Sequence, residues 1–173
     1  MLESTALRID VAELMHRPGA SKRLALDEHA PGLVLEMGHV ADEGAVHAEL
    51  LLESILEGIY VSGTVVGAWT FECRRCLTEF TDPFSVEVAD VYAYEQPDDD
   101  EGYQIEAAHI DLVPMIRDAV LLAAPLNPLH DPGCKGLCAE CGQDLNVADC
   151  GHRPERVSLA WEPLKRLREQ MGE

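Results

Sequence analysis

The first half of the chain alternates hydrophobic and polar residues in the way that half-buried β-strands do. Residues 46–53 place valine, alanine and leucine at every second position, and the positions between them are mostly polar. A period of two puts the apolar set on one face of a strand. Runs at 33–37, 59–66 and 84–92 are also β-rich. Because the gaps between these runs are too short for helical crossovers, we expect an antiparallel sheet.

Three segments have helical signals instead. The strongest covers residues 110–124, where Asp111 suits the N-cap position. A short helix is expected over 9–16 with Asp10 as its N-cap, and a last helix after Ser158. The apolar residues of the strongest segment recur at helical spacing and form one stripe, which we expect to pack on the sheet: Leu112, Ile116, Ala119, Val120 and Ala123.

Two Cys-x-x-Cys motifs carry the clearest chemistry of the sequence. The first pair is Cys73 and Cys76, and the second pair is Cys138 and Cys141. Each motif can turn two thiolates onto one ion, and a tetrahedral Zn²⁺ with four sulfur ligands needs two such turns. Scattered buried thiols, a disulfide framework and a thioredoxin-like redox pair fit less well, because most of the cysteines have metal-type spacing and neither pair begins a helix. We therefore expect structural zinc.

The cysteines admit more than one set of four ligands. The first set combines the two pairs, and it is the one we favour. A second set is local and joins the second pair to Cys134 and Cys150. In a third, Cys134 replaces one member of the first set. Two complete sites without shared ligands need an Asp or a His in addition to the cysteines, and His152 is one candidate. A site with four protein ligands has no open position, so its metal is structural.

These elements predict an α+β fold. Residues 1–125 are expected to form an antiparallel β-rich domain with a short N-terminal helix and a packed helix near 111–124. Residues 126–173 are expected to form a Cys-rich C-terminal zinc-knuckle module that ends in a helix. We expect the metal site to join the second part to the first.

The chain is strongly acidic: it has 13 Lys and Arg residues against 32 Asp and Glu residues, and its formal net charge is −19. Such a chain repels phosphate at long range, which excludes sequence-independent binding of nucleic acid by the whole surface. The basic residues gather in a few segments that folding could bring into one basic face, and a scatter of solvated charges is the alternative. The candidate RNA contacts lie in the first knuckle and near the N-terminus: Arg74, Arg75, Arg17, Lys22 and Arg23.

The N-terminal residues lack the basic and apolar regions of a secretory signal, and no apolar run approaches the ~18 residues of a membrane span. We expect a cytoplasmic protein that does not enter membranes. Its thiols are then kept reduced, which favours metal over disulfide bonds.

The order of the motifs resembles the YceD family, the large ribosomal RNA subunit accumulation proteins. The resemblance is carried by Phe-Glu-Cys-Arg-Arg-Cys-Leu at 71–77, the acidic run after it, Asp-Ala-Val-Leu-Leu-Ala-Ala-Pro-Leu at 118–126, and the cysteine-rich stretch at 134–146. The segment 17–19 is also similar to the N-terminal part of that family. Membership implies a cytosolic protein that is needed for normal levels of large-subunit ribosomal RNA and has no known catalytic activity.

From this resemblance we expect a non-enzymatic factor that supports accumulation of 23S ribosomal RNA and biogenesis of the large ribosomal subunit. Its expected partner is the ribosomal RNA precursor or a basic ribosomal protein, and no small-molecule substrate is expected. The alternative is a zinc-ribbon adaptor that binds a protein partner in transcription or another assembly. An enzyme is not expected, because no nucleophile–base pairing, phosphate loop or open metal site stands out and the seven histidines are scattered.

Overall fold

The computed structural model of the chain describes residues 7–29, 34–35, 38–41, 45–95, 102–153 and 167. Contacts between residues divide the chain into two compact units. The first consists of Met1–Cys73 and Thr78–His130, and the second of Arg74–Leu77 and Asp131–Glu173. The helix expected after Ser158 lies outside the described residues, apart from Leu167.

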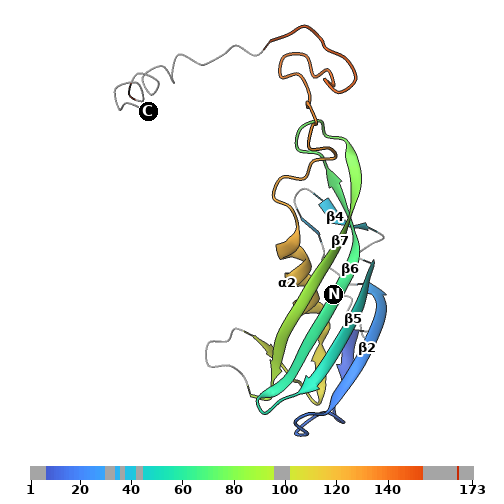
Figure 1. Cartoon of the computed structure of the whole chain (residues 1–173), viewed down its shortest axis with the longest axis vertical. Coiled ribbons are helices and arrows are strands. Elements are labelled where there is room, and N and C mark those ends of the chain that lie inside the picture. The colour runs from blue at the N-terminus through green and yellow to red at the C-terminus, as the bar shows by residue number, and fades with distance from the viewer. Residues whose placement is uncertain are drawn as a thin grey trace. The chain divides into compact units, whose positions relative to one another are not determined.

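The first unit is built on four long strands in the order β2, β5, β6, β7, each antiparallel to its neighbour (Figure 1). Their bounds are Ser21–His29, Ala45–Ser54, Gly58–Glu72 and Glu79–Ala93. β6 and β7 pair in register over their full lengths, from Gly58 with Ala93 to Glu72 with Glu79. The first pair of cysteines therefore lies in the turn of one long hairpin.

Shorter strands complete the sheet. β4 (Gly38–Val40) pairs with residues 69–71 of β6, on the edge that β5 occupies further along, and β3 (Val34–Leu35) pairs with β4. β8 (Tyr103–Gln104) runs parallel to β7, so the expectation of an antiparallel sheet is wrong at this one pairing. β1 (Arg8–Asp10) and β9 (His109–Asp111) form a separate antiparallel ladder.

Alternation in β5 confirms the sequence pattern that predicted a strand. Val46, Ala48, Leu50 and Leu52 are all buried, and the residues between them are half-buried or exposed. The inward residues of β6 and β7 extend the same layer, which is mostly aliphatic, with Trp69 and Phe71 toward the hairpin turn and Tyr92 toward the opposite end. These inward residues are Ile59, Val61, Val65, Trp69, Phe71, Val88 and Tyr92.

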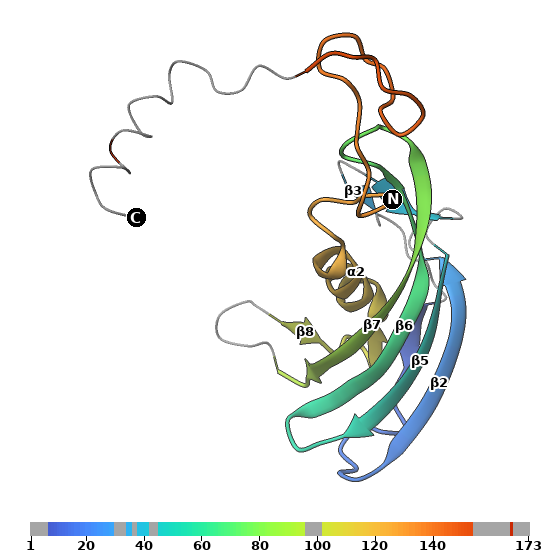
Figure 2. The same ribbon diagram turned by 45° about the horizontal axis from the view of Figure 1, so that its top comes forward.

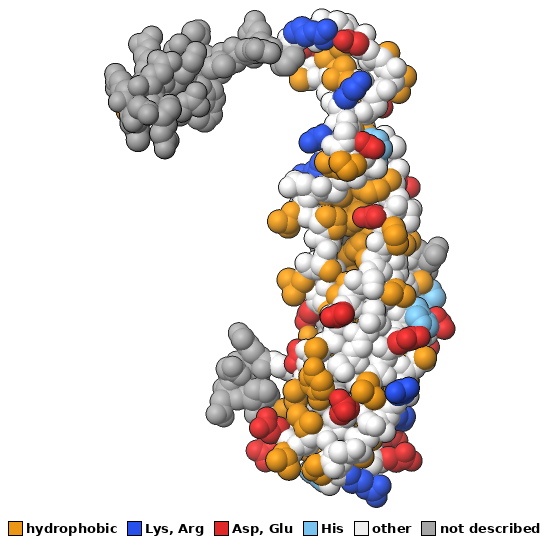
Figure 3. Space-filling model, viewed as in Figure 1, with side chains coloured by type: hydrophobic (Ala, Val, Ile, Leu, Met, Phe, Trp, Pro, Cys, Tyr) orange, Lys and Arg blue, Asp and Glu red, His pale blue; other side chains and the backbone are white. Residues whose placement is uncertain are grey.

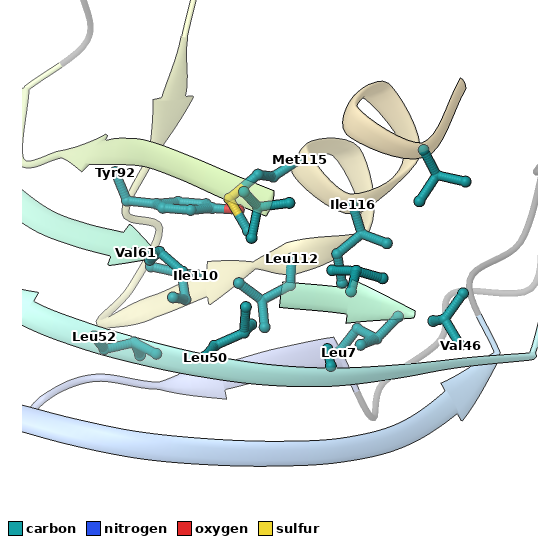
Figure 4. Packing of buried hydrophobic residues seen from close by; sticks show 14 of the residues in the cluster. Leu7, Val46, Leu50, Leu52, Val61, Tyr92, Ile110, Leu112, Met115 and Ile116 are labelled. Carbon is teal, nitrogen blue, oxygen red and sulfur yellow. The ribbon is translucent and has the colours of Figure 1, made fainter. Parts of the chain in front are cut away.

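Helix α2 (Leu112–Ala123) covers the concave face of this sheet (Figure 2). The expected N-cap is confirmed, because the Asp111 carboxylate accepts a hydrogen bond of 3.0 Å from the Val113 amide. Leu112, Met115 and Ile116 point toward the inward side chains of the strands (Figure 4). The apolar stripe is rotated from the expected one, since Met115 is buried whereas Ala123 is exposed.

Tyr92 ties β7 to the start of this helix. Its hydroxyl donates a 2.8 Å hydrogen bond to the Asp111 carbonyl, and its ring stacks on Tyr103 with centroids 5.2 Å apart. Burial raises the pKa of Tyr92 well above its usual value. The phenol is therefore a permanent donor at physiological pH. No helix among the described residues is long and apolar enough to cross a membrane.

The short helix expected over 9–16 is wrong. Ile9 pairs with Ile110 in the β1–β9 ladder, and a single turn follows in which the Met15 amide donates to the Val11 carbonyl at 3.1 Å. The Asp10 carboxylate does accept from a backbone amide, that of Ala12, at 2.8 Å. The apolar residues do recur at helical spacing, but this segment pairs with a strand that is distant in sequence and forms only one turn.

Ser54 at the end of β5 is a buried polar group for which no hydrogen-bond partner of Oγ is found within the described part of the chain. An unpaired buried hydroxyl destabilises a fold by roughly 1–3 kcal/mol. Ser54→Ala should therefore raise the free energy of unfolding in urea by about 1 kcal/mol, with Ser85→Ala on the exposed surface as the matched control. A loss of stability on Ser54→Ala would show that Oγ has a partner.

His47 on β5 has a raised pKa. Its Nδ1 lies 2.7 Å from Asp27 Oδ1 across the strand pair, and this hydrogen bond is the main cause, with Glu49 also contributing. The imidazolium is favoured in the folded state, so its contribution to stability is present below pH 6.5 and is lost as the pH rises through the raised pKa. We expect an NMR titration midpoint above 6.5 that falls in Asp27→Asn; an unchanged midpoint in the variant would contradict this pairing.

Candidate metal centres

The two Cys-x-x-Cys turns have the same type of backbone hydrogen bond. In the turn between β6 and β7, the Cys73 amide donates to the Thr78 carbonyl at 2.9 Å. In the second turn, the Cys138 amide donates to the Gln143 carbonyl at 2.8 Å. In both cases the donor is the first cysteine and the acceptor lies five residues later. The two loops therefore have the same backbone design, which directs both cysteines of a pair to one side.

The residue after each pair has a positive φ. Gly142 follows the second pair with a φ of 72°, a conformation that glycine adopts without a Cβ clash. Leu77 occupies the equivalent position of the first turn at 62°, although its side chain is 58% exposed and gains little from burial. The first turn is therefore strained at a position where glycine would be relaxed.

Leu77→Gly should stabilise the protein. The left-handed conformation costs an L-residue about 1–2 kcal/mol, and part of this gain is offset by the greater freedom of glycine in the unfolded chain. We expect a net gain of about 0.5–1 kcal/mol in urea unfolding of the metal-loaded protein. Leu77→Ala is the control, because it removes the exposed side chain and keeps the Cβ. Equal stability of the two variants would show that φ at this position is not limiting.

Among the described residues, six cysteines and two histidines gather into two clusters. The first cluster is Cys73, Cys76, His130 and Cys134, and the second cluster is Cys138, Cys141, Cys150 and His152. Within each cluster the four ligand atoms all lie within 4.8 Å of one another. Each offers three sulfurs and one imidazole, so each could hold a metal ion.

The distance between a sulfur and a nitrogen of the second cluster is close to the distance between two such ligand atoms around one Zn²⁺. Cys138 Sγ lies 3.8 Å from His152 Nδ1. Bonds of about 2.0–2.3 Å to a tetrahedral Zn²⁺ place neighbouring S and N ligands roughly 3.6 Å apart. The pKa of Cys138 is lowered to about 6, chiefly by backbone N–H groups of Cys141 and Glu140 that point at its sulfur. The metal-binding form of this thiol is therefore favoured at neutral pH.

The loop that carries Cys150 and His152 is fixed by an acidic residue. Asp149 accepts a 2.8 Å hydrogen bond from the Gly151 amide and forms an ion pair with Arg153, with oxygen and nitrogen 3.2 Å apart. The Arg153 guanidinium and the Gly151 amide lower the pKa of Asp149. Because the Asp149 carboxylate bonds to the loop itself, it is not counted among the ligands of the second cluster, which are three sulfurs and one imidazole.

Asn146 supports the first cluster from outside the ligand set. Its Nδ2 donates to Cys134 Sγ at 3.4 Å, and its Oδ1 accepts from the Lys135 amide at 2.8 Å. Asp144 Oδ1 accepts from the Asn146 side chain at 2.8 Å and so fixes its orientation. Hydrogen bonds of this kind orient a ligand and hold the thiolate form. Asn146 was not predictable as a supporting residue, because an amide in an irregular segment has no spacing signal.

The favoured set of ligands, in which the two Cys pairs share one ion, is not the arrangement in the structure. Each pair belongs to its own cluster, and Cys134 and Cys150 complete the sulfur ligands of the first and second cluster respectively. The additional ligands that two sites require are histidines. His152 was a candidate from sequence, whereas His130 was missed because it is a single histidine in a proline-rich segment.

The predicted RNA-contacting residues have different surroundings. Arg75 Nη1 donates to the Cys134 carbonyl at 2.8 Å and to the Pro132 carbonyl at 3.4 Å, so it braces the backbone of the second unit. Arg74 and Arg17 are exposed. Lys22 and Arg23 are part of β2.

Lys22 and Arg23 lie on opposite faces of the sheet. Successive residues of a strand point to opposite faces, and Arg23 pairs with outward Leu51 whereas Lys22 pairs with buried Leu52. Lys22 Nζ accordingly reaches the Asp10 carbonyl, at 3.5 Å, on the inner side. These two residues of the predicted basic face are therefore separated by the sheet.

The fold and the two clusters define a sheet-rich protein with two Cys/His groups that could bind metal. Residues 61–168 match the family described as large ribosomal RNA subunit accumulation protein YceD. The chain belongs to this family, as the order of its motifs predicted. The matched residues include the first pair of cysteines, α2 and both clusters in full.

The chain is also similar to several curated proteins. The uncharacterized protein Mb2951c of Mycobacterium bovis is 33% identical over 168 residues, which cover 93% of this chain and 81% of the relative. The uncharacterized protein YlbN of Bacillus subtilis is 24% identical over 114 residues, covering 64% and 66% respectively. A chloroplastic homologue of Arabidopsis thaliana, named large ribosomal RNA subunit accumulation protein YCED homolog 1, is 39% identical over 66 residues, covering 38% and 21%. No solved structure gives a significant match.

Proposed function

We propose that this protein is a non-enzymatic factor that supports accumulation of 23S ribosomal RNA and biogenesis of the large ribosomal subunit. The observation that carries the proposal is the family match over 61–168, together with the name that the plant homologues bear. The proposed location is the cytoplasm. The proposed partner is the ribosomal RNA precursor or a basic ribosomal protein.

We further propose that the metal is structural zinc, with one ion in each cluster. Three sulfurs and one imidazole are a ligand set that Zn²⁺ favours over Mg²⁺ or Ca²⁺, which prefer oxygen. Four protein ligands leave no open position for a substrate or an activated water. This argues for metal that stabilises the fold, and it supports a role without catalysis.

Depletion of the protein tests the biological part of the proposal. Cells that lack it should have a lowered ratio of 23S to 16S ribosomal RNA and fewer large subunits on sucrose gradients, and the tagged protein should sediment with large-subunit precursors. Plasmid-borne wild-type protein should restore the ratio. A normal ratio in depleted cells, with tagged protein confined to the top of the gradient after cross-linking, would refute the proposal and favour an adaptor that binds a free protein partner.

A further inference from the structure

The outer face of the sheet, opposite to α2, is not covered by any described element of the first unit (Figures 1 and 2). Strand register defines which residues lie on it. Ala25 pairs with Glu49, Glu49 with Thr64, and Thr64 with Glu87, so these four form one row across β2, β5, β6 and β7. They alternate with the buried residues of their strands and therefore point outward.

Charge on this outer face is almost entirely of one sign. The outward positions of the four strands include a single Lys or Arg residue, which is Arg23 at the edge strand. Glu49 is 79% exposed and Asp27 is 87% exposed, although His47 lies between them, with its ring nitrogens 3.7 Å from Glu49 Oε1 and 2.7 Å from Asp27 Oδ1. The acidic residues at outward positions are Asp27, Glu49, Glu53, Glu72, Glu79 and Glu87.

The middle of the outer face is uncharged. From Tyr60 to Thr70, the outward residues of β6 are tyrosine, serine, threonine, valine, alanine and threonine, and all are half-buried. Viewed from the side of β5, β6 and β7, the surface over the strands is largely white and orange, with separate acidic side chains (Figure 3). An uncharged centre with a charged rim is the usual anatomy of a protein interface.

A shallow depression lies beside this uncharged strip. It has a volume of about 600 Å³, and its lining includes Glu49, Leu51 and Ser62 from the outer face, with Arg23 at its edge-strand side. An apolar wall next to a carboxylate suits the long side chain of Lys or Arg, whose methylenes pack on apolar surface while the cationic end pairs with the acid.

We propose that the outer face of this sheet is a docking surface for a lysine- and arginine-rich protein segment, with Glu49 and Glu87 as its central anionic contacts. These two residues flank Thr64 from the neighbouring strands, so their backbones are about 10 Å apart. Two basic side chains of one segment laid across the sheet can reach both.

The charge of the face selects this occupant over the alternatives. RNA would bring phosphates against six carboxylates and is repelled. A second copy of the same face would place like charges opposite each other and is disfavoured in the same way. The inference rests on the proposed function in that the segment belongs to a ribosomal partner, but the binding surface is tested without reference to ribosomal RNA levels.

The experiment measures fluorescence anisotropy of a labelled short peptide of alternating lysine and threonine, titrated with the full metal-loaded protein at low ionic strength. The test variant is Glu49→Gln with Glu87→Gln. The control is Asp82→Asn with Asp90→Asn, two exposed acids of β7 at alternate positions that face the other side of the sheet. Both variants raise the net charge by the same amount, so only the face differs.

We expect the test variant to weaken binding of the peptide by roughly five- to tenfold and the control to change it by less than about twofold. Equal weakening by both variants would overturn the inference, because bulk negative charge would then explain the binding. Absence of peptide binding to the wild-type protein would also overturn the inference. Binding of an unlabelled RNA would overturn it too, if the test variant abolished that binding and the control variant did not. A normal ratio of 23S to 16S RNA in depleted cells bears on the proposed function and leaves this measurement unaffected.

Discussion

On the proposal of one zinc ion in each cluster, replacing Cys138 by serine should reduce the bound zinc from two ions per chain to one. The Cys138 sulfur lies 3.8 Å from His152 Nδ1 and belongs to the second cluster alone, while a serine hydroxyl stays protonated at neutral pH and is a poor ligand. Since binding of structural zinc contributes an apparent ~10–16 kcal/mol to the folding of small zinc peptides, order around residues 138–152 should be lost with the ion. The hydrophobic core, which comes from residues 7–120, should persist.

Metal analysis of the purified variants by mass spectrometry, with circular dichroism, checks this result. Cys76→Ser should release the other ion, and the double variant should release both. Val147→Ala, a substitution of a 79% exposed residue in the same segment, should retain two. Loss of both ions from Cys138→Ser alone, or retention of two, would contradict the assignment of the ligands to two separate clusters.

Replacing Trp69 by alanine should destabilise the first unit by about 3–5 kcal/mol. Its side chain is 2% exposed, stacks on Phe71 with centroids 5.3 Å apart, and meets Phe84 at 5.8 Å. The chain has few aromatic residues, and Trp69 is among the largest of its fully buried side chains. Removal therefore leaves a cavity that the neighbouring side chains fill only in part.

Urea unfolding followed by circular dichroism measures this loss. Phe84→Ala should cost less, because Phe84 is only partly buried, and Leu56→Ala should change little, because Leu56 is 85% exposed. If Trp69→Ala and Leu56→Ala had the same unfolding midpoint, the aromatic group would not stabilise the sheet.

The fold was predictable where the signal is local. Asp111 predicts the start of α2, and the alternation of apolar and polar residues at 46–53 predicts β5, because both signals depend on residues close in sequence. The β1–β9 ladder was not predictable, since Ile9 acquires its partner from residue 110 and the local pattern of 9–16 resembles a helix. Short ladders of this kind are determined by tertiary contacts that no window of sequence contains.

The cysteines of the two clusters were predictable from the sequence, but their pairing and the contribution of His130 were not. Spacing identified the two Cys pairs as turns that direct two thiolates to one side, and the shared backbone hydrogen bonds agree with that prediction. Spacing does not determine which distant residue completes each set. Cys134 and His130 join the first pair only because the chain returns to the hairpin turn after α2, and a lone histidine carries no signal of this in advance.

The different spread of the two ligand sets along the chain has a consequence for synthesis. All ligands of the second cluster lie within residues 138–152, whereas those of the first extend from Cys73 to Cys134. The entropy lost on closing a loop grows with its length, by about 0.6 kcal/mol for each doubling. The second cluster can therefore capture its ion as a short nascent peptide. A ribosome that stalls before residue 130 has made only Cys73 and Cys76 of the four candidate ligands of the first cluster, so interrupted translation produces chains in which this cluster cannot be completed.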